Sequence, residues 1–261
     1  MTDILPQVLL FLVLVAFIAG FIDSIAGGGG LITIPAMLLA GIPPLETLGT
    51  NKLQGLFGSG SATLAYARHG HVDLGEQWPL AAMTILGGGL GAILATVVPA
   101  EVLSGMLPFL LVAIALYFGF KPNLSDIDKH RRMAPLAFGL TVVPAIGFYD
   151  GVFGPGTGSF FMLAFVALAG FGVLKATAHT KLLNFGSNIG AFAVFLGFGV
   201  ILWKVGLLMG IGQFLGAQLG SRFAMKNGAR IIKPLLVVTC LALAVKLASD
   251  PANPVRVWLG F

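Results

Sequence analysis

The chain has 261 residues, of which 57% are hydrophobic and only 10% are charged, and its formal net charge is +5. A soluble domain carries roughly 25% charged residues, so this chain has too few of them to cover a water-facing surface. Its mean hydropathy is +0.97. The composition therefore excludes a soluble globular protein and predicts an all-α integral membrane protein.

Ten apolar segments follow one another along the chain, and eight of them are long enough to cross a bilayer as helices of ~20 residues. The second and the seventh are shorter, and glycine, proline and threonine flank or interrupt them. They are expected to be short spans, half-helices or re-entrant hairpins. The segments are residues 4–22, 31–41, 51–67, 78–98, 102–120, 134–153, 159–171, 180–198, 203–224 and 230–248.

Two motifs of the first half recur in the second half and predict an internal duplication. Residues 20–23 (GFID) return as 147–150 (GFYD), 127 residues later, and residues 51–53 (NKL) return as 180–182 (TKL), 129 residues later. Charged residues are rare here, so matched aspartates and lysines favour duplication over chance. The expected organisation is a first membrane repeat at 1–120, a cytoplasmic linker at 121–133 and a second membrane repeat at 134–261.

The basic residues predict how the repeats are oriented, because Lys and Arg accumulate in cytoplasmic loops. If all ten segments cross the membrane, most basic residues fall on one side. If the two short segments merely dip and return, the basic loops at 121–133 and 222–233 fall on opposite sides. Ten crossings are therefore favoured, with five segments in each of two inverted repeats, basic loops in the cytoplasm and both termini outside. The linker is interpreted as a solvated polar loop, with anionic-lipid contact as the alternative.

A glycine run interrupts each repeat after its first segment. No Gly-Lys-Ser/Thr follows the first run, so it does not match a phosphate-binding loop. Inside a membrane, glycine lets the backbone break where protein shields it from lipid. Two inverted breaks are expected to converge near the midplane. They comprise Gly27, Gly28, Gly29 and Gly30 in the first repeat, and Gly154, Gly156 and Gly158 in the second.

Asp23 and Asp150 each precede one of these breaks. A carboxylate at membrane depth is expensive, so it is usually paired or functional. Two interpretations stay open. Each aspartate either caps or braces the next helix, or carries a coupling proton.

Lys52 and Lys181 each stand at the start of the third apolar segment of their repeat. Asn184 and Asn188 follow Lys181 at i+3 and i+7, so all three share one helix face. A helix start, an ammonium group and amide side chains together predict an anion-binding site. The alternative is that each lysine extends to the membrane interface. The predicted substrate-binding residues are Thr50, Asn51, Lys52, Gln54, Thr180, Lys181, Asn184 and Asn188.

The motif GFIDSIAGGGGL at 20–31, with Pro35, GIP at 41–43 and GTNK at 49–52, resembles the sulfite exporter TauE/SafE family. The resemblance covers essentially the whole chain. It implies a permease of the bacterial inner membrane that moves small sulfur-containing anions such as sulfite, sulfoacetate or other organosulfonates. The second repeat departs from the first at Pro155 and His179, so the two halves need not contribute equally.

The expected function is a secondary-type transporter that exports or exchanges such an anion by alternating access. The alternatives are an anion channel, or a cation transporter that uses Asp23 and Asp150. The expected partners are the small anion and the lipid bilayer, with a homo-oligomer left open and nucleic acid excluded. The four histidines have no metal-site spacing, so no enzyme, metal site or cofactor is expected.

Overall fold

The computed structural model describes residues 5–98 and 126–228, together with 230–232, 234 and 238. Within these residues every regular element is a helix, which confirms the all-α prediction for the described part. The predicted segment at 102–120, and most of the one at 230–248, lie outside the described residues.

The described part of the first half contains four helices, and two of them begin at a proline. Pro6 and Pro44 stand at helix starts, where the missing N–H of proline costs nothing. Asp73 caps the fourth helix by accepting hydrogen bonds from the N–H groups of Gly75 and Glu76. The helices are α1 (Pro6–Ala26), α2 (Gly30–Leu39), α3 (Pro44–Arg68) and α4 (Leu74–Val97).

The second half repeats this order with two π-helical turns added. The short helix α6 (Pro135–Ala137) runs through the π-helix η1 (Phe138–Val142) into α7 (Val143–Val152). After a break, α8 (Thr157–Ala164) runs into the π-helix η2 (Phe165–Ala169). The long helices α9 (Val173–Gly197) and α10 (Trp203–Asn227) follow.

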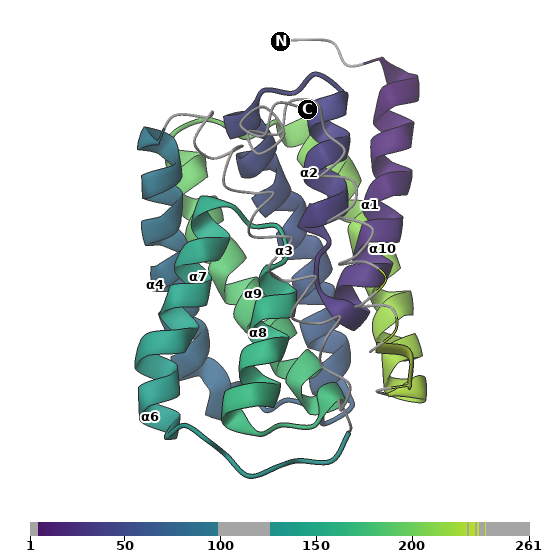
Figure 1. Cartoon of the computed structure of the whole chain (residues 1–261). Helices are drawn as coiled ribbons and strands as arrows, with labels where there is room; N and C mark the ends of the chain where they lie inside the picture. Colours follow the sequence, from purple (N-terminus) through teal and green to yellow (C-terminus); the bar gives the residue numbers. More distant parts are fainter. Residues whose placement is uncertain (1–4, 99–125, 229, 233, 235–237, 239–261) are drawn as a thin grey trace, which may run out of the picture.

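The short helices α2 and α8 each form a hairpin with the helix before them, and the two hairpins enter the molecule from opposite ends. In Figure 1, α1 descends from the top and α2 returns upward, whereas α7 rises from the bottom and α8 returns downward. With 10 residues, α2 is about 15 Å long, roughly half of a ~30 Å hydrocarbon core. Within the described residues, α2 is therefore a half-helix that returns toward the end from which α1 enters. The expectation that this segment crosses the membrane, as one of ten crossings, was wrong.

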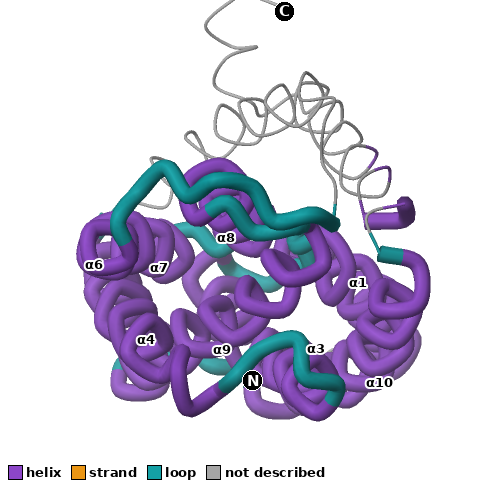
Figure 2. The backbone as a smooth tube through the Cα atoms, turned by 90° about the horizontal axis from the view of Figure 1, so that it is seen from below, coloured by secondary structure: helices purple, strands orange, loops and turns teal. Residues whose placement is uncertain are grey.

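Two long helices form the centre of the molecule. Seen from below in Figure 2, α3 and α9 lie between an α4–α7 group on one side and an α1–α10 group on the other. Glycines bring the outer helices together: a Cβ at Gly87 would overlap the Pro144 carbonyl oxygen, and a Cβ at Gly216 that of Phe17. These two contacts recur at the same offsets as the sequence motifs.

Three described helices are long and apolar enough to cross a membrane: Pro6–Ala26, Leu74–Val97 and Pro135–Val152. The helices α3, α9 and α10 are longer than α1 but carry polar side chains on buried faces. This explains why the predicted boundaries of two segments were wrong. Hydropathy placed their starts at 51 and 180, whereas the helices start at Pro44 and Val173.

The linker packs against the connection between η2 and α9. The N–H of Lys129 donates to the Gly170 carbonyl oxygen over 2.6 Å. Asp128 accepts the N–H of Gly172 over 2.7 Å and forms an ion pair of 2.9 Å with Lys175. Residues 126–132 are solvent-exposed, yet these contacts fix their path across the start of α9.

The Asp128 contact predicts a small pH dependence of stability. Its hydrogen bond to the Lys175 ammonium group, followed by the one from Gly172 N–H, lowers the pKa of the Asp128 carboxyl. A lowered pKa stabilises the fold above the unfolded value of about 3.9, and the contribution is lost as pH falls through the folded pKa. Since the pair is exposed, we expect less than about 1 kcal/mol at neutral pH.

Thermal unfolding measured from pH 3 to 7 tests this expectation. Asp128→Asn should unfold slightly earlier than wild type at pH 7, and the difference should shrink as the pH falls toward 3. Lys175→Met should give the same pattern, and the double variant no further loss. A pH profile of Asp128→Asn that is identical to wild type would contradict the assignment.

Candidate functional site

The two backbone breaks meet. Gly27 has a φ of +80°, and a Cβ on it would lie 2.5 Å from the carbonyl carbon of Gly158. The Ser159 hydroxyl donates to the Ala26 carbonyl oxygen over 3.2 Å. The tips of the α1–α2 and α7–α8 hairpins are therefore in direct backbone contact, which only glycine at these positions allows.

Each break ends at the N-terminus of a half-helix. The helix α2 starts at Gly30 and α8 at Thr157, and first-turn N–H groups of a helix lack intrahelical acceptors. Both positive helix ends thus lie at the breaks. The expectation that α3 and α9 provide the helix starts was wrong, because Lys52 and Lys181 lie about two turns inside those helices.

The two predicted lysines are paired with the two predicted aspartates, each across the halves. Lys52 Nζ lies 2.8 Å from Asp150 Oδ1, and Lys181 Nζ lies 3.4 Å from Asp23 Oδ2. Each ammonium group also donates to the backbone carbonyl oxygen of the same aspartate. All four residues are at most 5% exposed, so the lysines neutralise buried carboxylates and do not extend to an interface.

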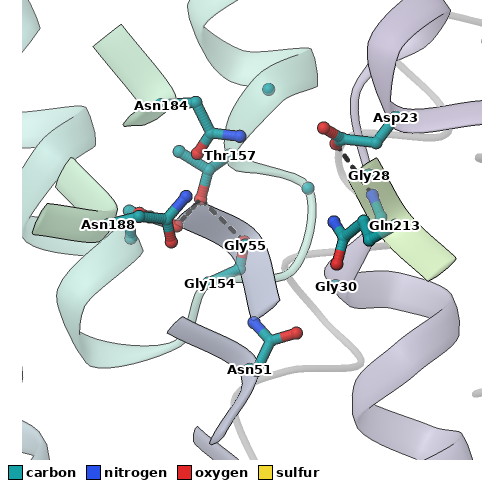
Figure 3. Close-up of a pocket in the computed structure, with 14 residues that line it drawn as sticks. Asp23, Gly28, Gly30, Asn51, Gly55, Gly154, Thr157, Asn184, Asn188 and Gln213 are labelled. Atoms are coloured by element: carbon teal, nitrogen blue, oxygen red, sulfur yellow. Dashed lines mark hydrogen bonds between the residues drawn. The ribbon is translucent and has the colours of Figure 1, made fainter. Parts of the chain in front are cut away.

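A small polar cavity of about 30 Å³ lies between the breaks, room for about two water molecules. Figure 3 shows amide side chains from α3, α9 and α10 around it, with Asp23 on the α1 side. Eleven of its lining residues are predicted site residues, and Gly55, Thr157 and Gln213 are additional. The lining residues are Asp23, Gly28, Gly29, Gly30, Asn51, Gly55, Asp150, Gly154, Gly156, Thr157, Gly158, Asn184, Asn188 and Gln213.

The ammonium groups lie directly behind the glycine walls of this cavity. Lys52 Nζ is 3.2 Å from where a Cβ of Gly154 would be, and Lys181 Nζ is 3.4 Å from the corresponding point on Gly158. Neither lysine lines the cavity itself. Without side chains on these glycines, little but backbone separates the charges from a bound molecule.

Asn51 is oriented by its neighbours. Its Oδ1 accepts hydrogen bonds of 2.8 Å from both Thr33 and Gln54, which fixes the amide and leaves Nδ2 as the free end. That nitrogen lies 3.5 Å from where a Cβ of Gly30 would be, at the cavity wall. Gln54 therefore acts through Asn51 and does not line the cavity.

The other predicted residues differ in their position. Asn184 and Asn188 line the cavity, and the Asn188 amide donates to the Ser59 hydroxyl over a long 3.5 Å contact. The Thr50 hydroxyl accepts the N–H of Leu202 over 3.0 Å, which joins α3 to the start of α10 away from the cavity. Thr180 is buried and does not line the cavity.

Asp23 and Asp150 each hold the start of the next half-helix. Asp23 Oδ1 accepts the N–H of Gly29 over 2.9 Å, and Asp150 Oδ1 accepts the Thr157 hydroxyl over 2.7 Å. This geometry matches the bracing interpretation. Because both aspartates also line the cavity, the coupling interpretation stays open.

Of the three cavity residues that were not predicted, two can be recognised in the sequence. Gln213 is an amide in an apolar stretch, at the repeat position of Thr84, and Thr157 occupies the repeat position of Gly30. Gly55 has no side chain, and its one signal in the sequence is that it occupies the repeat position of Asn184. In the described part of the chain, no group of three or more His, Cys, Asp or Glu side chains could hold a metal ion.

A multi-pass helical chain with a buried polar cavity between two broken helices is a membrane transporter, and the names of its relatives agree. The chain belongs to the sulfite exporter TauE/SafE family, which it matches over residues 12–247.

Three relatives illustrate the similarity. A probable membrane transporter protein, ORF9, of a Sinorhizobium species is 72% identical over 100% of both chains. One from Haemophilus influenzae is 48% identical over 95% of this chain and 97% of its own. The probable membrane transporter protein YfcA of Escherichia coli is 48% identical over 98% of this chain and 95% of its own. No solved structure matches the chain.

Proposed function

We propose that this transporter exports or exchanges a small sulfur-containing anion, such as sulfite, sulfoacetate or another organosulfonate, across the bacterial inner membrane. The family that the chain belongs to supports the substrate class. The single observation that carries the proposal is a cavity that lies at the N-termini of two half-helices. The carboxylates that line it, Asp23 and Asp150, are already neutralised by buried lysines.

The cavity favours an anion because it offers hydrogen-bond donors. The oxygens of an ionised sulfite or sulfonate group only accept hydrogen bonds. Donors are available from the α2 and α8 starts, from Asn51 Nδ2 and from the amides of Asn184 and Gln213. The lysines cancel the repulsion of Asp23 and Asp150, and the helix ends add positive potential. Lys52 and Lys181 thus act on the anion from behind the glycine walls.

A cation transporter is the second candidate, because two carboxylates line the same cavity. Each carboxylate already has a lysine partner, so a cation would compete with an ammonium group for the same negative charge. Competition between sulfonates and divalent metal ions separates the two candidates.

Alternating access through two inverted repeats is part of this proposal. Matched contacts support it. Lys52 of the first half pairs with Asp150 of the second, and Lys181 of the second half pairs with Asp23 of the first. The glycine contacts between α4 and α7 likewise correspond to those between α10 and α1. The helix ends that carry Arg68, Lys175 and Lys226 lie at the lower end in Figure 1. We assign that end to the cytoplasm by the positive-inside rule.

Thermal stabilisation of the purified protein tests the substrate class. We expect sulfite, thiosulfate, sulfoacetate or taurine to raise the unfolding temperature, and divalent metal ions to leave it unchanged. A ligand at 100 times its Kd adds about 2.7 kcal/mol to the stability of the state it binds. Stabilisation by the metal ions alone would favour the cation transporter.

Asn184→Leu locates the binding. Removal of a cavity donor should weaken the stabilising anion about tenfold, the loss of one hydrogen bond to a charged group. Asn227→Leu at the far end of α10 is the matched control, because its amide donates to the Phe223 carbonyl oxygen and not into the cavity. Equal anion affinities in the two variants would place the anion elsewhere.

A further inference from the structure

The two aspartates of the cavity differ in one respect. Both carboxylate oxygens of Asp23 have partners, since Oδ1 accepts the N–H of Gly29 and Oδ2 faces Lys181. In Asp150, Lys52 and the Thr157 hydroxyl both contact Oδ1. Its Oδ2 is buried and, among the residues that the structure describes, has no hydrogen-bond partner.

An unpartnered carboxylate oxygen at this depth needs an explanation. Asp150 is 2% exposed, and an unmet buried acceptor of an ionised group is strongly unfavourable. A proton on Oδ2 removes the negative charge and leaves the Oδ1 contacts in place. We propose that Asp150 Oδ2 binds the proton that this transporter couples to its anion. This assignment rests on the proposed function for its anion and identifies the coupling residue.

The charged groups around Asp150 are few, so the effect of the proton can be worked out. Lys52 on α3 is its direct partner, and the Asp23–Lys181 pair lies across the cavity. The neighbouring Tyr149 hydroxyl donates to the Pro155 carbonyl oxygen. On α9, His179 is packed against aromatic rings near the helix start. In its described residues, α4 has only Glu76, in its first turn.

Charge balance then fixes the direction of coupling. With both pairs ionised, the four groups sum to zero. A proton taken from solvent by Oδ2 leaves Asp150 neutral and Lys52 positive, so the site gains one positive charge. Proton and anion therefore each strengthen the binding of the other. The two travel in the same direction, and for an anion of single charge the cycle moves no net charge.

Infrared difference spectroscopy of the full-length protein tests the proton site without any transport. Stepwise acidification should produce a protonated-carboxyl band that is lost in Asp150→Asn, displaced in Asp150→Glu and retained in Asp23→Asn. The Asp150→Glu variant keeps the test valid if Asp150→Asn does not fold. A band that is the same in wild type and both Asp150 variants would overturn the assignment.

Transport of methanesulfonate into proteoliposomes tests the coupling, since its single charge is constant from pH 5 to 8. For wild type, external acidification should raise uptake by up to about tenfold per pH unit, the slope of one linked proton, and alkalinise the medium. Residual uptake by Asp150→Asn should change less than twofold. Wild-type uptake that is independent of pH would overturn the coupling. If no sulfur anion is transported at all, the proposed function fails, while the infrared result still decides the proton site.

Discussion

Lys52→Ala is expected to abolish transport and to lower the free energy of unfolding by about 3–5 kcal/mol, the cost of leaving one member of a buried ion pair alone. Asp150 would lose the charged partner that it has among the described residues, at a distance of 2.8 Å, in a site where both side chains are at most 3% exposed. Lys181→Ala should act in the same way through Asp23. The exposed Lys204→Ala at the start of α10 is the control and should change stability by less than about 0.5 kcal/mol.

A double variant separates the fold from the function. Lys52→Met combined with Asp150→Asn removes both charges, and replacing a whole buried pair is often close to neutral for stability. We expect thermal unfolding close to wild type but sulfite uptake in proteoliposomes that stays lost. If Lys52→Ala and Lys181→Ala both transport sulfite normally, the proposed role of the lysine charges in transport is wrong.

Gly27→Ala is expected to separate the two hairpin tips and to lower transport at least tenfold. A Cβ at this position would lie 2.5 Å from backbone atoms of both Gly158 and Ser159, and neither backbone can move without shifting the start of α8. The expected cost is 1–2 kcal/mol for alanine at positive φ, plus roughly 1–3 kcal/mol for overpacking.

Gly41→Ala is the matched control, because Gly41 has the same φ of +80° but nothing within 4 Å of its Cβ position. The difference between the two variants in thermal unfolding and in sulfite uptake isolates the contact between the breaks. Equal losses in both variants would mean that the contact contributes nothing beyond backbone strain.

Composition and glycine pattern were enough to predict the helical class and the place of both breaks. The helix starts were not predictable from hydropathy, because a charged residue stands in the first turn of each helix, Glu46 in α3 and Lys175 in α9. Glu46 is half-buried and Lys175 is exposed, and at such helix ends the apolar periodicity is weak. The predicted positions of Lys52 and Lys181 within their helices were therefore wrong by about two turns.

The sequence shows both lysines and both aspartates, but only the fold shows that they are paired. From the sequence alone, each lysine is predicted as a charge for an anion, and each aspartate as a helix cap or a coupling residue. Lys52 and Asp150 are 98 residues apart, and Lys181 and Asp23 are 158 apart. Only the antiparallel meeting of the two hairpins brings them together, and residue spacing along one helix cannot show such a contact.

Sulfite counterflow in proteoliposomes tests the central claim most directly. Vesicles loaded with unlabelled sulfite should accumulate labelled sulfite transiently, with a rate that saturates, and Asn184→Leu should require about ten times more sulfite for half-saturation. The control Asn227→Leu should match wild type. A flux that rises in proportion to sulfite concentration, without counterflow, would mean a channel, and no sulfite flux above that of protein-free vesicles would contradict the account.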